Sequence, residues 1–147
     1  MALQLFLNLT VGTLMIVLTV AIHTFGLIWV TQIMRWVTSR FRIHGHRSRV
    51  LAMITVVMGI FAILTCEVWL WAFCYWLIGF MKDFPTALYF SVSTFSTLGY
   101  GDVLPHPEWR LLGGLEGIDG FLLIGWSTAY LVAAGVRVGP FRSGEHF

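Results

Sequence analysis

Three long apolar stretches, separated by two short polar segments, dominate this 147-residue chain. A helix needs about 20 apolar residues to cross the hydrocarbon core of a membrane. The stretches cover roughly residues 3–37, 50–80 and 109–138. The first two are longer than a perpendicular span requires, so we expect them to tilt or to project beyond the bilayer. The pattern predicts three transmembrane helices.

The segment between the second and third stretches, residues 81–109, predicts a half-length helix and a return loop. Asp83 can cap free backbone N–H groups, and Pro85 is tolerated in a first helical turn. A helix over residues 85–96 would be about 18 Å long, which is half of a membrane span. The chain must then return through residues 97–102, and non-helical backbone at that depth survives only inside protein or beside water. We therefore predict an all-α integral membrane protein with a re-entrant helix and loop.

Composition agrees with a lipid environment, because 58% of the residues are hydrophobic and only 11% are charged. Soluble domains carry about 25% charged residues. Metal-binding and nucleotide-binding motifs are not found, and little sequence is left for a catalytic domain, so an enzyme is not expected. Cys66 and Cys74 would lie about 12 Å apart on one helix, too far to form a disulfide with each other. The N-terminal stretch lacks the features of a cleaved signal peptide and is interpreted as a retained helix.

Basic residues concentrate between the first two stretches, and basic loops stay in the cytoplasm. The cluster comprises Arg35, Arg40, Arg42, Arg47 and Arg49. We predict an N-terminal helix and basic linker (residues 1–49), a pore-type domain (50–140) and a short cytoplasmic tail (141–147). The N-terminus would lie outside, in a multi-pass cell (inner) membrane protein. The arginines could also contact anionic lipid headgroups; nucleic-acid binding is not expected in a chain this apolar.

Residues 96–102 read Ser-Thr-Leu-Gly-Tyr-Gly-Asp. This segment resembles the signature loop of potassium channels, which usually reads Thr-Val-Gly-Tyr-Gly-Asp. Tyr89 and Phe90 stand where that family often has aromatic residues on the pore helix. Residues 109–131 look like the inner helix of small bacterial members of the two-transmembrane ion-channel group. The first helix has no counterpart in the minimal version of that fold.

The resemblance implies a homotetramer whose four copies of the loop surround one four-fold pore axis. The backbone carbonyls of Thr97, Leu98, Gly99 and Tyr100 would then form a K⁺ selectivity filter, since rings of carbonyls can replace the hydration shell of an ion. The carbonyls must all point one way, which alternating left- and right-handed backbone conformations achieve. Gly99 and Gly101 stand at alternate positions and enter the left-handed region without steric cost.

Other residues would support the filter. By resemblance, Tyr100 would brace it from outside and Asp102 would lie at the outer mouth. Ser93 stands where several family members carry a glutamate paired with the outer aspartate, and Leu98 replaces the usual valine. Glu67 could substitute for the missing glutamate by bonding to Ser93, Thr94 or the filter backbone, or it could be a hydrogen-bonded structural residue. Both interpretations of Glu67 stay open.

Polar residues on the third stretch are costly at membrane depth unless they are paired or wet. For Glu116, hydrogen bonding between helices is favoured. For Asp119, exposure to the pore cavity or to the inner side of the filter is favoured, with Arg110 as an alternative partner for either carboxylate. Gly120 lies close to the glycine hinge of the family's inner helix, although close packing explains it at least as well. His23 is expected to be neutral and hydrogen-bonded.

The pattern and the resemblance together predict a potassium-selective channel that conducts K⁺ passively across the membrane. K⁺ ions in the filter and membrane lipids are the expected ligands; no organic cofactor, small-molecule substrate or nucleic acid is expected. Two alternatives remain: a weakly selective monovalent cation channel, and a non-conducting membrane subunit with a channel-like fold.

Overall fold

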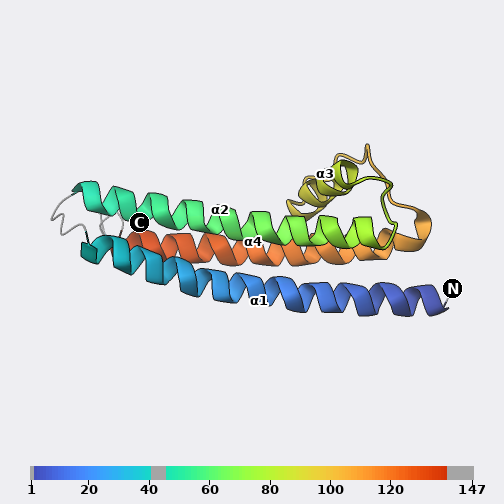
Figure 1. The fold of residues 1–147 in the computed structure, drawn as a ribbon, viewed down its shortest axis with the longest axis horizontal. Helices are drawn as coiled ribbons and strands as arrows, with labels where there is room; N and C mark the ends of the chain where they lie inside the picture. The colour runs from blue at the N-terminus through green and yellow to red at the C-terminus, as the bar shows by residue number, and fades with distance from the viewer. Residues whose placement is uncertain (1, 41–45, 139–147) are drawn as a thin grey trace.

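The protein is a bundle of three long helices with a short fourth helix at one end (Figure 1). The computed structural model describes residues 2–40 and 46–138. Within those ranges the regular elements are α1 (Ala2–Arg40), α2 (His46–Leu77), α3 (Phe84–Phe95), a single 3₁₀ turn (Pro107–Trp109) and α4 (Arg110–Val138). Residues 41–45 of the predicted basic linker and the tail after residue 138 lie outside the described residues.

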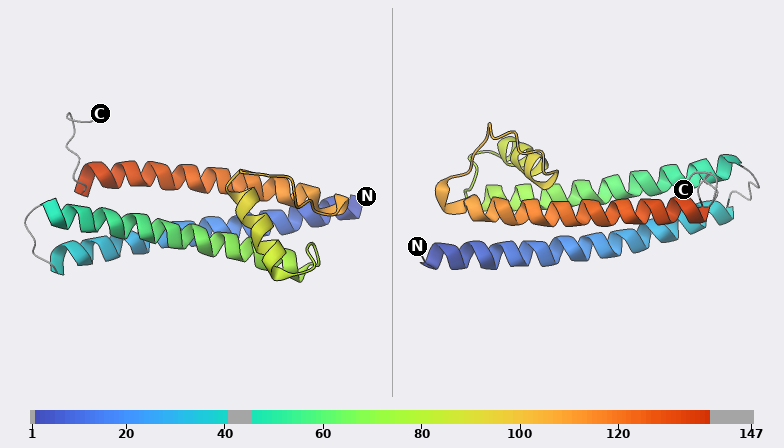
Figure 2. Two further views of the ribbon diagram at one scale, coloured as in Figure 1. Left: turned by 90° about the horizontal axis from the view of Figure 1, so that it is seen from above. Right: turned by 180° about the vertical axis from the view of Figure 1, so that it is seen from behind.

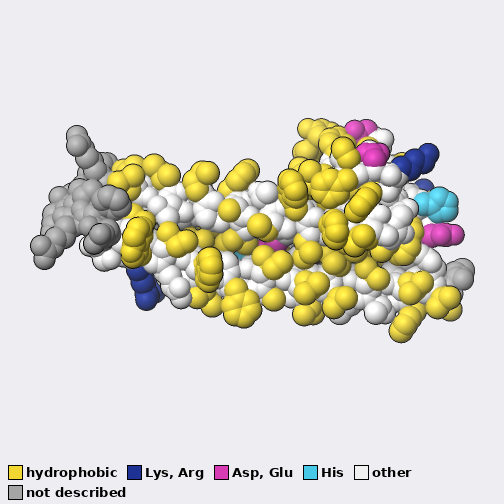
Figure 3. All heavy atoms as spheres, viewed as in Figure 1, with side chains coloured by type: hydrophobic (Ala, Val, Ile, Leu, Met, Phe, Trp, Pro, Cys, Tyr) yellow, Lys and Arg dark blue, Asp and Glu magenta, His cyan; other side chains and the backbone are white. Residues whose placement is uncertain are grey.

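All three long helices are apolar enough and long enough to cross a membrane, over residues 2–37, 49–77 and 107–137. This confirms the three predicted spans. Large apolar side chains cover the outside of the bundle; Phe25 and Phe121, for example, are 67% and 68% exposed. Figure 3 shows hydrophobic side chains along the whole length, with the charged side chains on this face gathered mainly near the two ends. Such a surface suits lipid rather than water.

The half-length helix α3 lies at the end of the bundle that also holds the N-terminus (Figure 1). It begins just after α2 ends, and the chain then returns to the same end before α4 starts. Helices α1 and α3 lie on opposite sides of the α2–α4 pair (Figures 1 and 2). The α2–α4 pair therefore connects the added first helix to the region around α3.

The start of α3 follows the predicted capping pattern. Asp83 has extended backbone, and its side chain accepts hydrogen bonds from both the backbone N–H and the hydroxyl of Thr86, each at 2.9 Å. Pro85 occupies the first turn, where its missing N–H costs nothing. The helix covers residues 84–95 rather than the predicted 85–96, a shift of one residue.

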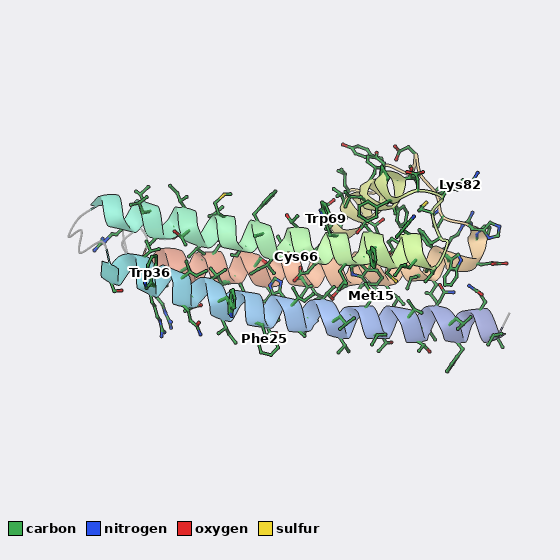
Figure 4. The ribbon with its side chains drawn as sticks, viewed as in Figure 1. Met15, Phe25, Trp36, Cys66, Trp69 and Lys82 are labelled. Atoms are coloured by element: carbon green, nitrogen blue, oxygen red, sulfur yellow. The ribbon has the colours of Figure 1, made fainter. Side chains whose placement is uncertain are left out.

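Aromatic side chains from α2, α3 and the turn between them pack together in the core at the α3 end. The ring of Tyr75 stacks on Phe80 at a centroid distance of 4.3 Å and meets Phe90 edge-on at 5.5 Å. Met15 is buried and points from α1 into this core, whereas Phe25 points away from the bundle (Figure 4). The core therefore holds α1 against the same pair of helices that supports α3.

The opposite half of the bundle has a second, aliphatic core between α1, α2 and α4. It comprises Leu27, Val30, Val56, Ile60, Ile63 and Ala134. Gly26 lets α1 approach α2 closely here, because a Cβ at that position would lie 2.7 Å from the Ile63 side chain. Small residues commonly permit such close contact between membrane helices.

Candidate functional site

Helix α3 ends in a turn that holds Thr97 in the left-handed backbone region, with φ of 60°. The N–H of Leu98 donates to the Ser93 carbonyl and the N–H of Thr97 donates to the Thr94 carbonyl, both at 3.0 Å. This is the Schellman pattern of helix termination, and the position of Thr97 in it is usually taken by glycine. The left-handed conformation costs a β-branched residue about 1–3 kcal/mol. Such strain leads to the hypothesis that function requires this backbone conformation.

Left-handed conformations then recur at every second residue. Gly99 has φ of 55° and Gly101 has φ of 75°, while Leu98 and Tyr100 between them are not in the left-handed region. The alternation expected at the two glycines is therefore present, and Thr97 extends it by one step. A strand with this alternation can turn successive carbonyls toward one side, which a regular β-strand cannot do.

The carbonyl groups of residues 97–100 accept no hydrogen bond within the described part of the chain. The segment is also open to its surroundings, since Leu98 is 55% exposed and Tyr100 is 69% exposed. Tyr100 is exposed in the single chain, and its expected role in bracing the filter stays a prediction. Among residues 2–40 and 46–138, these carbonyls therefore have no hydrogen-bond partner.

Two contacts fix the segment to α3. The Tyr89 hydroxyl donates to Oδ2 of Asp102 at 2.7 Å, and this hydrogen bond is the main reason that the pKa of Tyr89 is raised above its ordinary 10.0. The carbonyl of Ser93 accepts from the backbone N–H groups of both Leu98 and Gly99. The sequence predicted supporting roles for Asp102 and Ser93, but the Tyr89 hydroxyl was not foreseen as the partner of Asp102.

A hollow of about 560 Å³ is lined by residues of α3, of the segment after it and of α4. Its lining includes Thr94, Thr97, Gly117, Phe121 and Leu122. Phe121 and Leu122 are more than half exposed, so α4 presents an apolar face beside the filter-like segment. The hollow is large enough to receive side chains of another chain.

Glu116 is fully buried and joins three helices through its carboxyl group. Oε1 lies 2.5 Å from the Ser91 hydroxyl on α3, and Oε2 lies 2.5 Å from the Tyr75 hydroxyl on α2. The prediction of hydrogen bonding between helices is confirmed for Glu116. Its partners could not be named from the sequence, because Ser91 and Tyr75 carry no special signal there.

Glu67 does not contact the segment after α3. Its Oε1 lies 2.9 Å from Nδ1 of His23 on α1, and both side chains are fully buried. The interpretation of Glu67 as a substitute for the filter glutamate is therefore wrong, because this face of α2 is turned toward α1 rather than toward Ser93. The expectation that His23 is hydrogen-bonded is confirmed.

Asp119 also faces the bundle interior rather than a cavity. Its Oδ2 accepts from the Thr19 hydroxyl at 2.8 Å and from the Trp71 indole N–H at 3.0 Å, and the residue is 2% exposed. The predicted cavity position of Asp119 is wrong. The presence of α1 explains the error, because Thr19 gives the carboxylate a buried partner that the minimal fold does not offer.

Gly120 packs directly under the end of α3. A Cβ at this position would collide with the backbone carbonyl, C and Cα atoms of Phe95. Gly113 lies similarly close to the Phe90 ring, at 3.1 Å from where its Cβ would be. Packing thus explains Gly120 without a hinge, and the hinge role stays a prediction.

A family model described as ion channel matches residues 63–137, slightly more than half of the chain. The matched region runs from the middle of α2 through α3 and the left-handed segment to the last turns of α4, and leaves α1 outside. No match was found among curated proteins or among solved structures. Ion channels are not a class of enzymes. With three membrane-spanning helices and this match, the chain is a membrane protein that belongs to the ion channel family.

Proposed function

We propose that the protein is a potassium-selective channel in which four copies surround one pore and K⁺ flows passively along its axis. The observation that carries the proposal is the left-handed backbone at Thr97, Gly99 and Gly101. A threonine at a helix end that favours glycine has an energetic cost. Its hydroxyl or its backbone orientation, if needed for function, would explain why it is present. Coordination of a dehydrated cation is a need of this kind.

The carbonyls of Thr97, Leu98, Gly99 and Tyr100 would be the ion ligands. Their freedom from hydrogen bonds within the described chain supports this role. Four strands are required because one strand offers carbonyls on only one side of an ion, and K⁺ needs its whole hydration shell replaced. The tetramer would also fill the hollow between α3 and α4 and would cover the exposed Tyr100 with a neighbouring copy.

The proposed orientation places α3 and the N-terminus outside the cell membrane and the opposite end of the bundle in the cytoplasm. Arg35, Arg49 and Arg137 all lie at or near the end opposite to α3, on α1, α2 and α4 respectively. Basic residues that flank membrane spans favour the cytoplasmic side. In a bacterium this would be the inner membrane, with Asp102 and its partner Tyr89 at the outer mouth of the pore.

Ion flux through purified protein in liposomes tests the proposal. We expect wild-type protein to pass K⁺ and to discriminate strongly against Na⁺. Gly99→Ala should abolish K⁺ flux, because the Gly99 backbone has φ of 55°, a conformation that alanine disfavours. An added Cβ meets no atom within 4 Å in the single chain. The effect would then come from the backbone conformation or from neighbouring copies rather than from a clash in the subunit.

Gly79→Ala is the matched control. Gly79 has φ of 71°, equally open space and a position in the turn after α2, outside the proposed filter. It should keep K⁺ flux. Equal flux of Na⁺ and K⁺ through wild-type protein would favour the weakly selective channel instead. No flux from a well-folded wild-type protein would favour a non-conducting subunit.

A further inference from the structure

The carboxyl group of Glu116 lies where the half-length helix, α2 and α4 meet. Tyr75, Ser91 and Glu116 are each 0% exposed, so these polar groups have only one another and the backbone as partners. The Ser91 hydroxyl also lies 2.9 Å from the Val68 carbonyl of α2. Buried polar groups in a membrane must be paired in this way, because lipid offers no replacement.

The protons available at this cluster suit a neutral Glu116. The Ser91 hydroxyl has one proton but lies within bonding distance of two acceptors, the Val68 carbonyl and Oε1 of Glu116. If Glu116 carries a proton on Oε1, it donates to Ser91, Ser91 donates to Val68, and Tyr75 donates to Oε2. All of the groups are then satisfied, and no net charge is buried.

This cluster lies less than two helical turns before the proposed filter, because Ser91 is six residues before Thr97. Ser91 is two residues before Ser93, whose carbonyl accepts from Leu98 and Gly99. Ser91 lies on α3, so its hydrogen bond to Glu116 on α4 sets where the end of α3 presents the Ser93 carbonyl, and with it the first residues of the proposed filter. Together with the Gly120–Phe95 contact, Glu116 fixes α3 against α4 at two points.

We propose that Glu116, as a neutral acid, is a positioning residue that sets K⁺ over Na⁺ selectivity by holding α3 and the filter segment in register. The inference deepens the proposed function and rests on it. Glu116 does not touch the ion; it acts through Ser91 and the end of α3. Glutamine should replace it well, because its amide NH₂ can donate to Ser91 while its carbonyl accepts from Tyr75.

Asp119 provides a matched comparison on the same helix, one turn away. It is almost as buried and also makes hydrogen bonds to two side chains, but these are Thr19 on α1 and Trp71 on α2. Its removal should destabilise the bundle without displacing α3. A purely structural role for Glu116 would make the two carboxylates behave alike.

The test is the permeability ratio of K⁺ to Na⁺, measured from reversal potentials of reconstituted protein under bi-ionic conditions. Glu116→Ala should lower the ratio about tenfold, as expected for the loss of a buried hydrogen bond between neutral groups. Glu116→Gln should restore most of it. Asp119→Ala should lower the unfolding temperature at least as much as Glu116→Ala does, yet leave the ratio within about twofold.

A Glu116→Ala protein that stays assembled and keeps the wild-type ratio would overturn the inference, as would an Asp119→Ala protein with an equally lowered ratio. If Glu116→Ala does not assemble, Ser91→Ala decides: a lowered ratio supports the inference and an unchanged ratio overturns it. If wild-type protein itself does not discriminate K⁺ from Na⁺, the proposed function falls, and this inference with it. If the wild-type protein is selective and the Glu116→Ala and Ser91→Ala variants are equally selective, the inference about Glu116 is wrong and the proposed function stands.

Discussion

The segment after α3 and the interior between α1, α2 and α4 differ in how their polar groups are hydrogen-bonded. Carbonyls of residues 97–100 are unpaired within the described chain, and the residues around them are exposed. In the interior, by contrast, His23 meets Glu67, Thr19 and Trp71 meet Asp119, and Thr31 meets Tyr130 at 2.6 Å.

The difference shows which part of the molecule is complete in one copy. The interior polar pairs link α1 to the other helices within one chain, so they stabilise the fold of that chain. The exposed segment instead has a costly backbone at Thr97 and no partner for its carbonyls in the described residues. Under the proposed function, assembly of four copies around an axis would supply what this segment lacks.

Removal of His23 should give the largest loss of stability. His23→Ala leaves the buried Glu67 carboxyl without the His23 contact, and its Oε2 already has no hydrogen-bond partner within the described chain. We expect the free energy of unfolding to fall by about 3 kcal/mol, since breaking a buried pair leaves one group uncompensated. Thermal unfolding in detergent measures the loss.

The double variant His23→Ala with Glu67→Ala serves as the control for that loss. It should be more stable than the sum of the two single losses predicts, because neither partner is left unpaired. Additive losses would show that the His23–Glu67 contact contributes little. Ion selectivity of the assembled protein should change little in either case, since the pair lies away from α3.

Substitution of Gly120 tests the contact between α4 and the end of α3. Gly120→Ala should cost about 1–3 kcal/mol, because its Cβ collides with the Phe95 backbone, which cannot move without displacing the end of α3. Gly125→Ala meets nothing within 4 Å and should gain up to about 1 kcal/mol of helix stability. Equal unfolding temperatures for the two variants, with a changed opening rate only in Gly120→Ala, would instead favour a hinge.

Substitution of Tyr89, which bonds to Asp102 beside the exposed segment, should have the smallest effect on K⁺ flux. The bond to Asp102 raises the pKa of Tyr89, so the protonated phenol stabilises the folded arrangement up to pH 10.0, and this contribution is lost as pH rises through the raised value. Wild-type K⁺ flux should therefore decline at alkaline pH. Tyr89→Phe should begin with lower flux and show a flatter alkaline profile.

Tyr130→Phe is the control for the alkaline profile, because the Tyr130 hydroxyl bonds to Thr31 far from the filter segment. It should keep the wild-type decline. An unchanged decline in Tyr89→Phe would mean that another group titrates.

Sequence patterns predicted the elements of this fold well, because membrane spans and helix starts depend on local signals. Apolar length gave the three spans, and Asp83 with Pro85 gave the start of α3 within one residue. The alternation of Gly99 and Gly101 likewise follows from the special backbone freedom of glycine.

Pairings between helices could not be predicted in the same way. A position near the filter was left open for Glu67 and a cavity position was favoured for Asp119, because their helix faces were unknown. Helix α1, which supplies His23 and Thr19 as partners, has no counterpart in the minimal fold. Helix rotation in a bundle depends on packing between residues that are far apart in sequence. A hydroxyl such as that of Tyr89 or Ser91 becomes informative only after the rotation is known.

The arrangement of copies around the filter segment tests the central claim most directly. A cryo-electron microscopy map of the purified protein in lipid nanodiscs with K⁺ should show four subunits around one axis, residues 97–100 facing that axis, and density for ions between their carbonyls. A monomer or dimer in which residues 97–100 face lipid or bulk water would contradict the account.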